Sequence, residues 1–229
     1  MSSGFSRWWN CPKKHLKRLR YWIPEAKKLY AQIGEKRPFR YFTLCSREMI
    51  DVFSLVHEGV IHRDNSLHKV GHVKFCERDE KIFPEIKEML GYEDAGFKGN
   101  LDDIVLFEDG EGSELLRTMQ EIELEFEQQG ESMKSERRGK LAEKLDPLML
   151  RESFPFDFLN LDFCDPYYPN PPNTMRVNDT IERIIEWQKR SVIEQGKPFQ
   201  LKRFLIAVTC KLENRLPETT YSRLTKIVN

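Results

Sequence analysis

Cysteine is scarce in this sequence, and its spacing excludes two classes of small domain. The 229-residue chain has five cysteines, which are widely separated and never form a Cys-x-x-Cys pair. An odd number of distant cysteines is not the pattern of a disulfide scaffold, and the missing pairs exclude a zinc ribbon. We therefore expect reduced thiols and a core built by apolar packing.

Long apolar runs are absent as well. No stretch approaches the roughly 20 apolar residues that a membrane-spanning helix needs, and residues 1–9 lack the apolar centre of a signal peptide. With 39% hydrophobic and 11% aromatic residues, the chain has enough apolar side chains to fold. The sequence thus predicts a cytoplasmic protein that has no membrane partner.

Net charge is zero, but the charges are segregated along the chain. Between Arg7 and Arg40 there are eleven lysine and arginine residues against only Glu25 and Glu35, whereas the range 102–131 holds eleven acidic residues and one basic residue. Two oppositely charged surfaces follow. We expect the first to suit a nucleic acid and the second a protein partner, although a solvated helical face explains the acidic stretch better.

Residues 1–39 form a basic segment in which aromatic residues alternate with lysine and arginine. Leu16, Leu19, Trp22 and Ile23 recur at helical spacing, which predicts a basic amphipathic helix, and Pro24 is expected to start a second helix. Aromatic rings among basic side chains suit the bases and phosphates of DNA or RNA. A solvated helix whose rings pack on the rest of the protein explains the pattern about equally well.

Strand and helix patterns alternate from residue 40 onward, which predicts a Rossmann-like α/β domain over residues 40–229 with a mostly parallel sheet. The range 97–107 fits either a strand with its turn or a strand at 104–107. Residues at about 110–152 are rich in charge, and we expect a helical insertion there. The other strands are expected at 40–45, 69–77, 156–163 and 204–210, and helices at 48–56, 80–90 and 178–193.

The clearest functional motif follows the strand expected at 156–163. Asn160 and Asp162 lie within that apolar run, and Asp165-Pro-Tyr-Tyr168 comes directly after it. We expect a loop there, because proline cannot donate to the hydrogen-bond ladder of a central strand. Ligands of open parallel sheets bind beyond the carboxyl ends of the strands, so this loop is expected to face a ligand. An ordinary turn set by Asp165 and proline is the competing explanation.

This succession of elements resembles the class I S-adenosylmethionine-dependent methyltransferases. The resemblance rests on Glu77, which closes the second expected strand, and on the Asp-Pro-Tyr-Tyr motif after the fourth. It implies that Glu77 accepts hydrogen bonds from the ribose hydroxyls of S-adenosylmethionine. It also implies that Asp165 accepts a hydrogen bond from the target amine of a nucleic acid, while Tyr167 or Tyr168 stacks on the base.

The same resemblance implies further cofactor contacts along this edge of the sheet. They are Thr43, Cys45 and Ser46 after the first strand, Asp79 after the second, Asn100 near the third and Asp162 in the fourth. A capping role explains Ser46 and Glu48 better, and Glu77 also suits a cap. No metal is expected, because the histidines at 57, 62, 68 and 72 match no standard ligand spacing.

The loop 43–48 contains no glycine, although the resemblance calls for a Gly-x-Gly turn that lets the backbone approach the cofactor. This favours a second hypothesis, a catalytically inactive Rossmann-like module that binds nucleic acid or protein within a larger assembly. A third is a nuclease or hydrolase in which Asp162 and Asp165 hold a divalent metal.

Overall fold

The computed structural model describes residues 16–33, 37–44, 47–64, 69–91, 95–106, 149–167, 171–194 and 203–212. Within these ranges, the side chains of residues 69, 164–167, 171–176, 190–194 and 210–212 are not described. The expected insertion at about 110–152 therefore lies outside the described residues apart from 149–152. The same is true of residues 1–15 of the basic segment.

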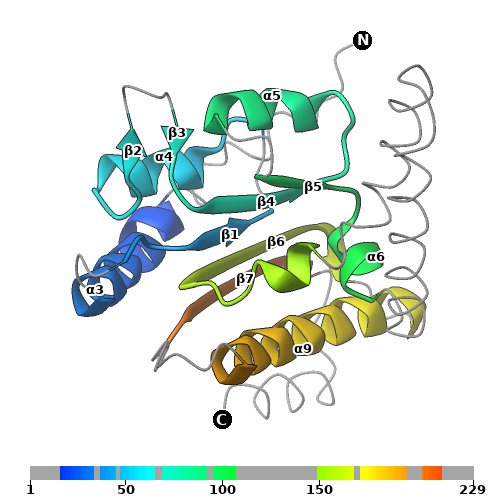
Figure 1. The fold of residues 1–229 in the computed structure, drawn as a ribbon. Helices are drawn as coiled ribbons and strands as arrows, with labels where there is room; N and C mark the ends of the chain where they lie inside the picture. The colour runs from blue at the N-terminus through cyan, green and yellow to red at the C-terminus, as the bar shows by residue number, and fades with distance from the viewer. Residues whose placement is uncertain are drawn as a thin grey trace, which may run out of the picture.

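A five-stranded sheet forms the centre of the protein, and every pairing in it is parallel (Figure 1). The strands lie in the order β5-β4-β1-β6-β7, which is 3-2-1-4-5 when they are counted along the chain. The predicted α/β class with a parallel sheet is confirmed, and this order is compatible with a Rossmann-like arrangement. The strands are β1 (Tyr41–Thr43), β4 (Val73–Glu77), β5 (Gly96–Lys98), β6 (Phe158–Tyr167) and β7 (Leu205–Leu212).

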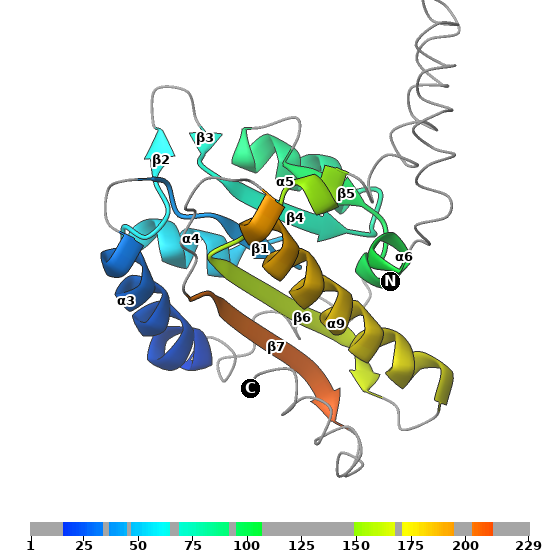
Figure 2. The same cartoon turned by 60° about the horizontal axis from the view of Figure 1, so that its bottom comes forward.

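Helices cover both faces of the sheet and bury a separate apolar core on each. On one face lie α3 (Ile23–Ile33), α4 (Ile50–His57) and α5 (Ile82–Leu90), which pack against Tyr41, Phe75 and Phe158. On the other face lie α6 (Leu101–Val105) and α9 (Pro171–Glu194), and Figure 2 shows α9 running along β6. Among the described residues, we find no helix with the length and apolar character needed to cross a membrane.

Three of the predicted elements differ in detail from the structure. The run 69–77 is divided by a turn in which His72 has a φ of 56°, so β3 (Lys69–Val70) pairs with β2 (Arg63–Asp64) and only β4 joins the main sheet. The range 97–107 contains β5 followed by α6, so a strand at 104–107 is excluded. The helix expected from residue 178 begins at Pro171, because proline is tolerated in the first turn of a helix.

The strand β6 continues through Asp165 and Pro166 to Tyr167, so the expected loop at Asp165 is wrong. The physical reason is that β1 ends at Thr43, opposite Asn160, and gives β6 no partner beyond that residue. Proline is accepted where a strand has lost a neighbour or contains a bulge. Both conditions hold, because Asp162 pairs with Thr209 and Pro166 with Lys211, which leaves two extra residues in β6.

The basic segment forms one helical run over residues 16–33, without the break expected at Pro24. A π-helical turn, η1 (Arg18–Trp22), comes directly before α3, and the amide of Ile23 donates to the carbonyl of Arg18. This wider turn rotates the preceding residues relative to α3. Leu16 and Leu19 are consequently exposed, at 50% and 44%, whereas Arg18 is buried on the face that we expected them to occupy.

Candidate ligand-binding edge at the centre of the sheet

The chain changes direction in the sheet between β1 and β6, and this position brings Thr43, Glu77, Asp79 and Asn100 of the predicted site residues to one edge. From β1 the chain runs outward through β4 and β5, then crosses to β6 and β7 on the other side. Thr43 ends β1, Glu77 ends β4 and Asn100 follows β5. Ligands of open α/β sheets bind beyond the strand ends at such a reversal. We call this edge of the sheet, beyond the ends of β1, β4 and β5, the reversal edge.

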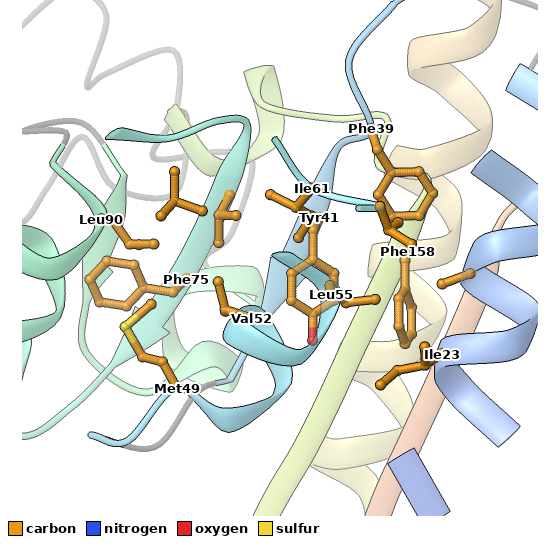
Figure 3. Close-up of a cluster of buried hydrophobic side chains, with 14 of the residues drawn as sticks. Ile23, Phe39, Tyr41, Met49, Val52, Leu55, Ile61, Phe75, Leu90 and Phe158 are labelled. Atoms are coloured by element: carbon orange, nitrogen blue, oxygen red, sulfur yellow. The ribbon is translucent and has the colours of Figure 1, made fainter. Parts of the chain in front are cut away.

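A buried carboxylate lies beneath the reversal edge. Asp51, in the first turn of α4, accepts hydrogen bonds at Oδ2 from the Tyr41 hydroxyl (2.6 Å), the Thr43 hydroxyl (2.7 Å) and the Asn160 amide nitrogen (2.9 Å). Figure 3 shows the ring of Tyr41 among Leu55, Val52 and Phe158. We call these four polar residues the Asp51 hub, and it ties α4 to β1 and to Asn160 of the neighbouring β6.

The hub leaves one acceptor at the reversal edge without a partner. Because the carboxylate of Asp51 accepts, the NH2 group of Asn160 faces it, and the Asn160 Oδ1 atom points elsewhere. That oxygen and the Glu48 Oε2 atom are both buried, and neither has a hydrogen-bond partner within the described ranges. Buried acceptors are normally satisfied, so two open acceptors near the end of β1 favour a ligand that brings hydrogen-bond donors.

Glu77 is held in place by the turn that follows β4. Its Oε1 atom accepts from the amide of Asp79 (2.8 Å), and its carbonyl accepts from Gly99 (3.0 Å), whose φ of 136° suits glycine. Burial raises the pKa of the Glu77 carboxyl, while the nearby backbone amides of Asp79 and Arg78 oppose that shift. A half-buried carboxylate at the end of the second strand is the position that the resemblance requires, and its role in ribose binding stays a prediction.

Asp79 and Asn100 have local structural contacts. Asp79 Oδ1 accepts from the amides of Lys81 (2.8 Å) and Ile82 (3.3 Å), which satisfies the start of α5. The Asn100 amide nitrogen donates to Asp103 (3.0 Å) at the start of α6. Both residues lie on the reversal edge and are exposed, so their cofactor contacts stay predictions.

The structure describes the remaining predicted site residues to different extents. Thr43 is fully buried, with its hydroxyl engaged by Asp51, and Asp162 is buried in β6 two residues beyond Asn160. Asp165 and Tyr167 belong to the far part of β6, where side chains are not described. Tyr168, Cys45 and Ser46 lie outside the described residues.

The loop between β1 and α4 uses a left-handed backbone conformation without glycine. Met49, the N-cap of α4, has a φ of 47° and makes no side-chain cap. The expected capping role of Glu48 stays a prediction, and its Oε2 atom has no hydrogen-bond partner among the described residues. Left-handed conformations cost an ordinary residue about 1–2 kcal/mol, and strain of this kind concentrates at functional sites.

Sequence reasoning missed the residue at the centre of this edge. Asp51 was passed over because it lies within an apolar helical pattern. A carboxylate among Ile50, Val52 and Phe53 was itself the available signal, because a buried charge requires partners. In the part of the chain that the structure describes, no three His, Cys, Asp or Glu side chains converge as metal ligands would.

Comparisons of the chain with protein-family models, with curated proteins and with solved structures give no match.

Proposed function

We propose that the protein binds S-adenosylmethionine at the reversal edge and methylates an amine of a nucleic acid. The observation that carries the proposal is the strand order, which puts the end of β1 beside Asn160 of β6 and Glu77 at the end of the neighbouring β4. S-adenosylmethionine supplies an activated methyl group. The open acceptors Asn160 Oδ1 and Glu48 Oε2 fit a ligand rich in hydrogen-bond donors.

In this proposal each residue has a defined task. The Glu77 carboxylate accepts from the two ribose hydroxyls, and Asp165 accepts an N–H of the target amine so that its lone pair is oriented. Tyr167 or Tyr168 stacks on the base that carries the amine. A neutral amine attacks with its own lone pair, so orientation is the main contribution of the protein.

Calorimetric titration with S-adenosylmethionine and S-adenosylhomocysteine tests the cofactor step. Loss of hydrogen bonds to a charged acceptor costs about 1.5–3 kcal/mol, so Glu77→Ala is expected to weaken binding about ten- to a hundredfold. Glu88→Ala is the matched control, because Glu88 is an exposed glutamate on α5. Wild-type protein that releases no heat with either ligand refutes the proposal.

One observation favours the second hypothesis, a catalytically inactive nucleic-acid-binding module. Lys17 and Arg20 are exposed on the N-terminal helix beside Tyr21, which is 63% exposed. This surface suits phosphates and a stacked base without any need for a cofactor.

Gel shifts with single-stranded DNA and RNA across a salt series test that surface. Changing Lys17 and Arg20 to alanine is expected to reduce the slope of log affinity against log salt by about 1 to 2. Lys28→Ala is the control, because Lys28 already pairs with Glu25 at 2.7 Å. Binding that does not respond to salt removes the phosphate-contact hypothesis, and binding without any response to S-adenosylmethionine favours the inactive module.

A further inference from the structure

Arg18 is a buried cation whose hydrogen bonds are incomplete. Its side chain is 5% exposed, and its Nε and Nη1 atoms have no hydrogen-bond partner among the described residues. The Trp22 ring lies 5.9 Å from the guanidinium carbon, which gives a cation–π contact but no acceptor. A guanidinium keeps its charge when it is buried, so these donors require an acceptor.

The π-helical turn is what brings Arg18 into the core. Because the amide of Ile23 donates to the carbonyl of Arg18, five residues earlier, Arg18 lies one wide turn before Ile23. Ile23, Ala26 and Leu29 form the buried side of α3, so Arg18 extends that side toward the sheet.

A small cavity separates Arg18 from the Asp51 hub. Its lining is mainly apolar and includes Ile23, Leu55 and Phe158, and the polar residues that line it are Arg18, Tyr41 and Asp51. The volume is about 10 Å³. A single water molecule needs roughly 10–15 Å³ measured in this way, together with two to four polar partners.

We propose that one water molecule occupies this cavity and bridges the guanidinium of Arg18 to the carboxylate of Asp51. The volume excludes larger ligands, and the carboxylate disfavours a small anion. An empty cavity would leave the buried Nε and Nη1 donors of Arg18 without an acceptor, which is unfavourable for a charged group. Water accepts from Arg18 and donates to Asp51, which gives the guanidinium the acceptor that it lacks among the described residues.

The bridge adds a polar link between two parts of the protein that also share an apolar core. Arg18 belongs to the helix that carries the exposed Lys17 and Arg20, and Asp51 holds Asn160 at the reversal edge. The water therefore fixes the basic helix to the centre of the sheet through a hydrated ion pair. This role does not depend on methyl transfer.

A crystal structure of the wild-type protein, at a resolution that shows ordered water, tests the proposal directly. We expect one water within hydrogen-bonding distance of Arg18 Nε or Nη1 and of Asp51. An empty cavity, or a guanidinium in direct contact with the carboxylate, overturns the proposal.

A double-mutant cycle of unfolding equilibria gives the second test. If the bridge forms, Arg18→Met and Asp51→Asn are coupled by at least about tenfold in the unfolding constant, or about 1.4 kcal/mol. The control cycle pairs Asp51→Asn with Arg20→Met, which alters an exposed arginine of the same turn and is expected to show no coupling. Equal coupling in the two cycles contradicts the bridge.

If Asp51→Asn does not fold, Tyr41→Phe replaces it in both cycles, because Tyr41 is the other polar residue of the hub at the cavity. We then expect a coupling of about threefold with Arg18→Met, since one hydrogen bond is removed. Additive effects in that cycle overturn the proposal.

Discussion

Replacing Asp51 by alanine removes the acceptor on which the centre of the protein depends. The change leaves the Tyr41 and Thr43 hydroxyls without the carboxylate oxygen that they reach at 2.6 and 2.7 Å. The Asn160 amide keeps a weaker partner, the Thr43 hydroxyl oxygen at 3.2 Å. A buried donor left without an acceptor costs about 1–3 kcal/mol, so two such donors give about 4 kcal/mol. Domains of this size are stable by about 5–15 kcal/mol, so the loss is large.

Urea unfolding followed by tryptophan fluorescence and circular dichroism measures this loss. Asp51→Asn keeps the shape and one acceptor oxygen, so we expect it to cost less, about 1–2 kcal/mol. Ser54→Ala on the same helix is the control, because the Ser54 hydroxyl donates only to the Ile50 carbonyl oxygen of its own helix, at 2.6 Å. The reasoning is refuted if Asp51→Ala lies within about 1 kcal/mol of wild type at an unchanged m value.

Three further predictions concern packing and pH. A Cβ atom placed on Gly96 would lie 2.6 Å from Cε1 of the Phe75 ring, which is too close. Gly96→Ala is therefore expected to lower the free energy of unfolding in urea by about 1–3 kcal/mol. An unchanged free energy of unfolding contradicts this packing. Burial, reinforced by the charge of Asp51, holds the pKa of the Tyr41 hydroxyl well above its usual 10.0, so above about pH 10 only the unfolded state ionises it. The free energy of unfolding therefore falls as the pH rises further. Tyr41→Phe is expected to reduce that fall, with tyrosine ionisation followed by absorbance at alkaline pH. Because its pKa is raised, the Glu77 carboxyl keeps its proton to a higher pH in the folded state than in the unfolded state. The contribution of Glu77 to the free energy of unfolding therefore falls as the pH rises from 4.5 through the folded pKa. Glu77→Gln is expected to remove that pH dependence in unfolding measured between pH 4 and 7.

The architecture could be predicted because local patterns and general topology rules agree. The strands at β1, β4, β6 and β7 are short apolar runs separated by helical periods, and such alternation leads to a parallel sheet. Glu77 was placed correctly at the end of its strand for the same reason.

The details that failed depend on contacts between distant segments. The passage of β6 through Pro166 follows from the early end of β1, more than a hundred residues away along the chain. The Asp51 hub joins Tyr41 and Thr43 to Asn160 across a similar separation. Such pairs are not visible in a local sequence pattern, because the sequence around each partner only reports the helix or strand to which that partner belongs.

The π-helical turn carries a consequence for how the chain tolerates change in length. Such a turn is an α-helix with one additional residue, and one residue turns a helix by about 100°. Deletion of a single residue within η1 would restore an ordinary α-helical turn, in which Arg18 lies four residues before Ile23 and stays on the buried side while Leu16 and Leu19 stay exposed. Deletion of one residue within α3 would instead turn all the preceding residues by about 100° and carry Arg18 away from the sheet. The chain can therefore lose a residue at η1 with less effect on its interior than anywhere else in this helix.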